Sequence, residues 1–185
     1  TYQLSGQYQT ANYTKDPGNR LQWRHSPQRM DAEALRDAML LASGKLNLQP
    51  AVASVVAKLS GEYGRGAGIG PGLQTNTYRS VYLPIVRNAV PDSLKLFDFA
   101  EPSILVGERP VTTVPTQALF FLNSTFVSNQ CDELASKLLN QNSMDDAARV
   151  DAAYRTVLSR PATESEIGRA MQFIDQTAGL FEAEK

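Results

Sequence analysis

Apolar residues recur at helical spacing in several separate stretches of this chain, and no other feature restricts the fold as much. Residues three and four positions apart line one face of a helix, whereas strands alternate every second residue. Helical spacing occurs in the stretches 26–44, 50–59, 115–122, 124–138, 143–158 and 163–174. Strand-like alternation occurs once, in Arg79–Arg87, where Pro84 restricts any strand to an edge or a bulge. The pattern predicts a mainly α, irregular helical domain with at most one short strand element.

The first of these helices has clear signals at both ends. Ser26 can accept a hydrogen bond from an unpaired backbone N–H, Pro27 is tolerated in a first turn, and Gly44 can end the helix. A second helix is predicted from Pro50, although the valines that follow would equally suit a short strand. The stretch 61–72 is predicted to be a glycine-rich surface loop, because it lacks the lysine and Ser/Thr of a phosphate-binding loop.

The C-terminal third predicts a helical hairpin. Ser143 and Asp146 have the three-residue spacing of a capping box, and Thr163 and Glu166 have it again. Arg160-Pro161 interrupts the chain between the two helices that these boxes begin. We therefore expect two antiparallel helices joined by a short connection.

Charge and composition argue against two classes of site. The net charge is −1, without the concentrated positive charge that binding to a phosphate backbone needs, so no nucleic-acid partner is expected. Cys131 and His25 are the only cysteine and histidine, and they cannot supply the three or four soft ligands of a zinc site. We therefore expect no metal site.

Two further stretches bear on the cellular setting. The chain opens on Thr1 without the basic leader and apolar core of a signal peptide, so we expect a piece excised from a longer protein. The uncharged stretch Pro110–Cys131 has the length of a membrane span but contains Pro115, Gln117 and Asn123. We interpret it as buried protein interior and expect no membrane insertion.

Nucleophilic catalysis has weak support. A Ser-His or Cys-His mechanism would have to use His25, which lies beside Ser26 at a predicted helix start. Capping or surface roles suit that position better, and Cys131 is predicted to pack on an apolar stripe. The catalytic residues are therefore unknown.

Charged residues on the first helix predict an ion ladder. Arg29, Glu33, Arg36 and Asp37 stand three and four positions apart, so opposite charges meet along one face. We interpret them as a solvated or interface ladder rather than as catalytic carboxylates.

The middle of the chain holds the most suggestive polar cluster, a candidate anion site. Its members are Arg79, Ser80, Tyr82, Arg87, Asp98, Arg109, Gln117 and Asn123. Guanidinium groups held in place could bind a carboxylate, a sulfate or a sugar acid. The alternative, which we prefer, is that Asp98 and backbone carbonyls satisfy these arginines internally. Asp98 is then the predicted counter-ion of Arg79, Arg87 or Arg109.

Several blocks match, in order, the pattern of one known family. They are Asp16–Leu21 with Trp23-Arg24, Arg29–Gly44, Arg79–Pro84, Phe97-Asp98, Arg109–Asn123 with its Pro-Thr-Gln-Ala-Leu core, and Tyr154–Glu166. The chain resembles the C-terminal domain of unknown function of large, mainly planctomycete, multi-domain proteins. These proteins often also carry a planctomycete-type cytochrome c domain. The resemblance implies that residues 1–185 are a single domain, a fragment truncated at both ends of the family domain.

The resemblance also implies an exported or cell-envelope protein with haem elsewhere in the parent chain. No Cys-x-x-Cys-His sequence is present here, so no cofactor is expected in this fragment. We expect a non-catalytic structural or interaction module whose partners are the other domains of the parent protein. The alternative is an enzymatic or ligand-binding unit that acts on polysaccharide-derived material through the central arginines.

Overall fold

The computed structural model describes residues 3–50, 75–87 and 90–183. The chain divides into two compact units, 1–30 and 31–185, which are called unit 1 and unit 2 below. Each is compact by itself, and the expectation of one domain over residues 1–185 stays a prediction.

Unit 1 contains one short helix, α1 (Thr10–Lys15). The chain turns at Asp16–Asn19, where Asn19 has a φ of 52° and its backbone N–H donates to the Asp16 carbonyl. The Asp16 carboxylate accepts from the backbone N–H groups of Arg20 and Leu21 at 3.0 and 2.7 Å. These bonds hold a tight reversal of the chain after α1.

Aromatic packing supports unit 1. The rings of Tyr8 and Tyr13 lie 5.1 Å apart, and Trp23 meets Tyr8 edge to face. The Arg24 guanidinium lies over both Tyr8 and Trp23, at 5.6 and 4.9 Å from the ring centroids. Cation–π contacts of this kind are attractive and help to order a segment with little apolar burial.

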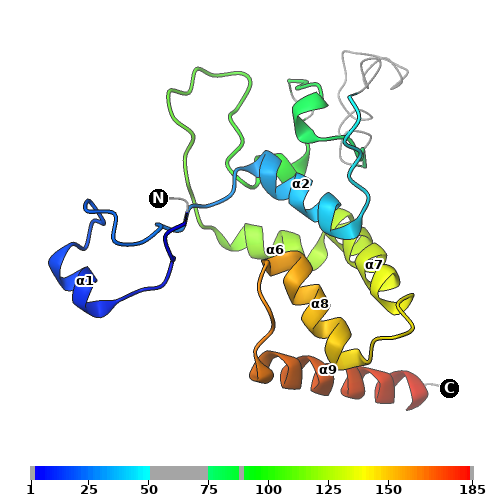
Figure 1. Cartoon of the computed structure of the whole chain (residues 1–185). Helices are drawn as coiled ribbons and strands as arrows, with labels where there is room; N and C mark the ends of the chain where they lie inside the picture. Colours follow the sequence, from blue (N-terminus) through cyan, green and yellow to red (C-terminus); the bar gives the residue numbers. More distant parts are fainter. Residues whose placement is uncertain (1–2, 51–74, 88–89, 184–185) are drawn as a thin grey trace. The chain divides into compact units, whose positions relative to one another are not determined.

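Unit 2 is an assembly of helices, and α2 is its central element (Figure 1). Its elements are α2 (Ala32–Ser43), a 3₁₀ turn η1 (Ser80–Tyr82), α5 (Asp92–Lys95), α6 (Pro115–Asn123), α7 (Thr125–Leu139), α8 (Asp146–Leu158) and α9 (Glu164–Ala183). Helix α2 packs against α5, α7, α8 and η1, whereas α9 packs on α8. The predicted mainly α fold is confirmed, and no strand occurs in the ranges that the structure describes.

The apolar core lies where α2, α5, α6 and α7 meet. Its buried members are Ala32, Leu40, Val90, Leu94, Phe97, Phe120 and Phe126. Phe97 and Phe120 pack edge to face with their centroids 5.7 Å apart, a favoured aromatic geometry. Burying side chains of this size contributes about 1.5–3 kcal/mol each, so this cluster is the main apolar stabilisation of unit 2.

The helix starts show which local signals prevail. Helix α2 begins at Ala32, after Asp31, so the predicted start at Ser26-Pro27 is wrong. Its predicted end is confirmed, because Gly44 adopts a φ of 79°, which a residue without a Cβ adopts freely. Helix α8 is capped by Asp145, whose carboxylate accepts from the Ala148 N–H at 2.8 Å, rather than by Ser143.

The last hairpin follows its sequence signals closely. Thr163 and Glu166 form the reciprocal bonds of a capping box, with Thr163 N–H to the carboxylate at 2.9 Å and Glu166 N–H to the hydroxyl at 3.3 Å. Helix α8 ends at Leu158, directly before the predicted break at Arg160-Pro161. Ala162 N–H then donates to the Asp151 carboxylate at 2.9 Å, which ties the connection back to α8.

Two other expectations need correction. The start of Arg79–Arg87 is helical rather than extended, because Leu83 N–H and Tyr82 N–H close a 3₁₀ turn onto the carbonyls of Ser80 and Arg79. An isolated parallel bridge joins Asn47 to Tyr78 instead. The stretch Pro110–Cys131 is mostly exposed, because α6 and α7 bury only one side; its buried residues are Gln117, Phe120 and Phe126.

Two predicted segments lie outside the described residues. They are the helix after Pro50 and the glycine-rich loop 61–72. Within the described ranges, no helix is both long and apolar enough to span a membrane.

Candidate functional site

Arg36 is the most deeply buried charged side chain in the described ranges, with 0% exposure. It projects from the middle of α2 and donates to the carbonyl of Asn76, to the carbonyl of Tyr78 at 3.0 Å and to the Ser80 hydroxyl at 3.2 Å. Burial lowers the pKa of Arg36, and the nearby Asp37 carboxylate offsets part of that shift. A guanidinium remains charged even so, because its ordinary pKa is far above neutral pH. Hydrogen bonds to residues 76–80 stabilise this buried charge.

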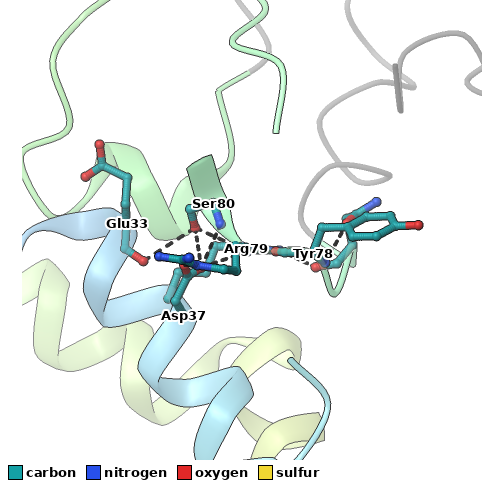
Figure 2. Close-up of polar contacts among 7 residues, drawn as sticks. Glu33, Asp37, Tyr78, Arg79 and Ser80 are labelled. Atoms are coloured by element: carbon teal, nitrogen blue, oxygen red, sulfur yellow. Dashed lines mark hydrogen bonds and ion pairs between the residues drawn. The ribbon is translucent and has the colours of Figure 1, made fainter. Parts of the chain in front are cut away.

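Asp37 and Ser80 complete this clasp, the name used below for the cluster of Arg36, Asp37 and Ser80 (Figure 2). The Ser80 hydroxyl and N–H both donate to one Asp37 carboxylate oxygen, at 2.7 and 2.8 Å. Arg79 extends towards the other oxygen, 4.0 Å away, with half of its side chain exposed. Since Ser80 is only 6% exposed, its hydroxyl is not presented to a substrate and serves to hold η1 on α2.

The expected ion ladder on the first helix is therefore wrong for Arg36. Its three-residue spacing from Glu33 is that of a surface ladder, but α2 is covered on this side by η1 and α7. The guanidinium also lies 5.9 Å from the centroid of the Phe126 ring on α7. Helical spacing alone does not distinguish a charged residue in water from one beneath another segment.

Glu33 holds a second arginine on the outer side of α2. Its two carboxylate oxygens accept from the two terminal nitrogens of Arg109 at 2.7 and 2.8 Å, a bidentate pair. Partial burial acts to raise the pKa of Glu33, but the hydrogen bonds and charge of Arg109 outweigh it, and the pKa is lowered. The pKa of Arg109 is raised by the same hydrogen bonds. Arg109 also lies over the Phe99 ring, 5.3 Å from its centroid.

Asp98, at the start of one loop, is hydrogen-bonded to Thr112 at its end. Its carboxylate accepts from the Thr112 N–H at 2.8 Å and from the Thr112 hydroxyl at 2.7 Å. Buried Gln117 joins the same place, donating to the carbonyls of Leu96 and Thr112 at 2.8 and 3.3 Å. Three predicted members of the cluster, Asp98, Arg109 and Gln117, therefore organise the segment between α5 and α6.

A cavity of about 510 Å³ lies between the clasp and the Glu33–Arg109 pair. Its polar wall holds Arg79, Arg109, Glu33 and Asp37 with Asp31, and its apolar wall includes Phe99 and Leu94. Arg109 enters it already paired with Glu33, and Arg79 faces Asp37. Carboxylates therefore already face the two predicted anion-binding arginines that line this cavity, Arg79 and Arg109.

The remaining predicted members lie apart from this cavity. Tyr82 and Arg87 are exposed, and neither lines it. Asn123 donates to the Leu119 carbonyl of its own helix at 3.0 Å and lines a different cavity of about 840 Å³. That second cavity is floored by core residues such as Phe120, and Lys45 and Glu133 at its edge pair at 2.7 Å. Of the predicted cluster, only Arg79, Ser80 and Arg109 therefore share one cavity.

The counter-ion prediction for Asp98 is revised for two of its three arginines. Arg109 pairs with Glu33 and Arg79 lies nearest Asp37, so both carboxylates come from α2. Pairing between Asp98 and Arg87 stays a prediction. Glu33, Arg36 and Asp37 are the residues that sequence reasoning missed at this site, and no local signal marks a partner more than forty residues away.

The candidate nucleophile and base are also placed by the structure. Cys131 is exposed, so the prediction that it packs on the apolar stripe of α7 is wrong. His25 lies in unit 1, where its backbone N–H donates to the Ser5 carbonyl at 3.0 Å. In the described part of the chain, no group of three or more His, Cys, Asp or Glu residues could hold a metal ion.

One family model matches nearly the whole chain. It is described as PSD1, a protein of unknown function (DUF1553), and it matches residues 1–174. The chain belongs to this family. The expected resemblance to a domain of unknown function is thereby confirmed at that level. No curated protein and no solved structure matches the chain.

Proposed function

We propose that this PSD1-family chain is a non-catalytic structural or interaction module that docks on the other domains of an exported multi-domain parent protein. The observation that carries the proposal is the open apolar surface of the last two helices. Helix α8 contains no buried residue, and neither does the part of α9 whose side chains are described. Large apolar side chains left in water at this density are typical of surfaces that another protein covers.

The exposed apolar residues have helical order. Phe173 and Leu180 are 69% and 68% exposed and stand seven positions apart on α9, which places them on one face. Val157 and Leu158 at the end of α8 are also more than half exposed. The opposite side of α9, which includes Ile167 and Met171, is the more buried side. Helix α9 therefore presents a second apolar side.

The polar groups support a structural role as well. The clasp and the Glu33–Arg109 pair use their hydrogen bonds to hold distant segments on α2. We do not favour the alternative of an enzymatic or ligand-binding unit for polysaccharide-derived material, because a ligand anion would have to displace Glu33 from Arg109.

Co-purification of residues 1–185 with the separately produced remaining domains of the parent protein tests the proposal. We expect a complex, and we expect Phe173→Asp with Leu180→Asp to abolish it. The matched control changes two exposed residues of the same helix that lie off the Phe173–Leu180 face, Gly168→Asp with Gln172→Asp, and should leave the complex intact. Separate elution of the wild-type components would contradict the proposal.

We also propose that this part of the chain carries no haem and no stoichiometric metal, with any haem held elsewhere in the parent protein. One histidine and one cysteine, without a haem attachment sequence, support this. Elemental analysis of the purified chain should find less than one equivalent of iron or zinc. One equivalent per chain would overturn this part of the proposal.

A further inference from the structure

The segment between α5 and α6 leaves unit 2 and returns to it at a closed neck, and it is drawn as a long green loop in Figure 1. Asp98 and Thr112 form the neck through two hydrogen bonds of 2.7 and 2.8 Å. Gln117, itself 5% exposed, binds the carbonyl of Thr112 from inside the domain. Residues 99–111, called the docking loop below, therefore form an Ω-like excursion whose ends are held together.

A second contact holds the docking loop on α2. Arg109 donates two short hydrogen bonds to Glu33 and covers the Phe99 ring at the other end of the loop. Near the tip, Ile104 N–H closes a turn onto the Glu101 carbonyl at 3.3 Å. A loop ordered in this way loses less conformational entropy when it binds than a free one.

The tip of this ordered loop is apolar and faces water. Leu105 is fully exposed, Ile104 is 65% exposed, and Val106 follows them. Surface loops are usually polar at their tips, and burial of an exposed leucine side chain in an apolar pocket is favourable. Each of these three successive aliphatic side chains is at least 39% exposed, so in the described structure they offer an apolar anchor to a partner.

The charges beside the tip indicate the chemistry of its partner. Glu101 and Glu108 flank the apolar residues, and the nearest base, Arg109, is engaged by Glu33. The outer part of the loop is therefore acidic. Complementary charge would come from lysine or arginine side chains around an apolar pocket, whereas the acidic flanks would be repelled by anionic lipid.

We propose that the docking loop inserts Ile104–Val106 into an aliphatic pocket with a basic rim on another domain of the parent protein. The proposal rests on the function proposed above and adds the residue that anchors the contact, Leu105. The carboxylates of Glu101 and Glu108 meet the basic rim, and the closed neck holds the tip in its binding position.

Photo-crosslinking in the full-length parent protein tests the inference. The chain carries Leu105→p-benzoylphenylalanine, is irradiated, and its cross-links are mapped by mass spectrometry. We expect cross-links to aliphatic residues of another domain, next to lysine or arginine. Adding Ile104→Asp should lower the yield about tenfold, the effect of losing one well-buried anchor. The matched control places the same probe at Val111, which is 76% exposed beside the neck, and should give background yield.

Other outcomes overturn the inference and separate it from the proposed function. Cross-links from position 105 only to residues 1–185, to a second copy or to lipid would overturn it. The same probe at Phe173 provides the comparison. If Phe173 cross-links to other domains and position 105 does not, the docking loop fails while the proposed module stands. If neither position cross-links to another domain, both proposals fail. Unchanged unfolding midpoints show that the probe-bearing chains are folded.

Discussion

The region around α2 and the α8–α9 hairpin are stabilised in different ways. Around α2, the clasp joins Arg36 and Asp37 to residues 76–80, which lie about forty positions away in the chain. In the hairpin, Glu166 binds Thr163 and Arg160, which lie three and six positions away. The first region depends on burial of charged groups, and the second on local hydrogen bonds in water. Changes of similar chemistry should therefore have different effects in the two regions.

The largest expected effect is in the clasp. Arg36→Met should lower the free energy of unfolding by about 3–5 kcal/mol, because it removes the cation beside Asp37 and leaves the carbonyls of Asn76 and Tyr78 without their Arg36 donor. Denaturant unfolding measures the change. The control is Arg79→Met, half exposed and 4.0 Å from the same Asp37, which should change stability by about 0.5 kcal/mol or less. Equal effects of the two changes would show that Arg36 is not the buried tie.

A smaller effect is expected at the neck of the docking loop. Asp98→Asn should cost about 1.5 kcal/mol, since the amide keeps one acceptor for Thr112 but loses the charge-assisted bond. The φ of 62° at Asp98 is tolerated by asparagine, so backbone strain does not contribute. Thr112→Ser, which keeps the hydroxyl, should be near neutral, whereas Thr112→Val should lose stability. A stability loss from Thr112→Ser equal to that from Thr112→Val would remove the hydroxyl bond from the neck.

In the hairpin, loss of one cap should matter about as much as in an isolated helix. Thr163→Ala should cost about 1 kcal/mol, the usual effect of a lost N-cap, and should speed amide exchange in the first turns of α9. Thr177→Ala is the matched control, because that hydroxyl bonds only to the Phe173 carbonyl within its own helix. No change in α9 exchange with Thr163→Ala would contradict the cap.

The smallest effect concerns pH. Hydrogen bonds from Arg160 and Thr163 lower the pKa of Glu166 from 4.5 to about 2. The folded hairpin therefore favours the carboxylate, and its stabilisation is complete above pH 4.5 and lost as the pH falls through about 2. The unfolding midpoint should fall across this window and fall less in Glu166→Gln. Identical acid profiles of the two chains would show that Glu166 is not linked to folding.

Sequence reasoning succeeded in the hairpin and at several helix ends for a common reason. The stop at Gly44, the start at Pro115 and the Thr163–Glu166 box depend on φ preferences and bonds within a few residues. The start of α2 was misplaced at Ser26-Pro27 because cap signals also occur in turns and coil. The apolar spacing of α7 correctly predicted a helix but did not show that Cys131 faces solvent.

The candidate site was less predictable from sequence. Arg79, Ser80 and Arg109 line one cavity, but their carboxylate partners come from α2. Tyr82 and Arg87 adjoin η1 in sequence, yet neither lines the cavity. The choice of partner depends on which face of α2 is covered, and a linear pattern of charges contains no information about that covering.

The amino-acid sequence by itself determined that this protein is mainly helical, and it determined where most of its helices end, because those outcomes follow from interactions between near neighbours. Only the tertiary structure decided that Arg36 is buried, that Glu33 holds Arg109, and that Asp98 closes a loop on Thr112. These contacts join segments far apart in the chain, and packing of α2, α5, α6 and α7 into one apolar core brings those segments together.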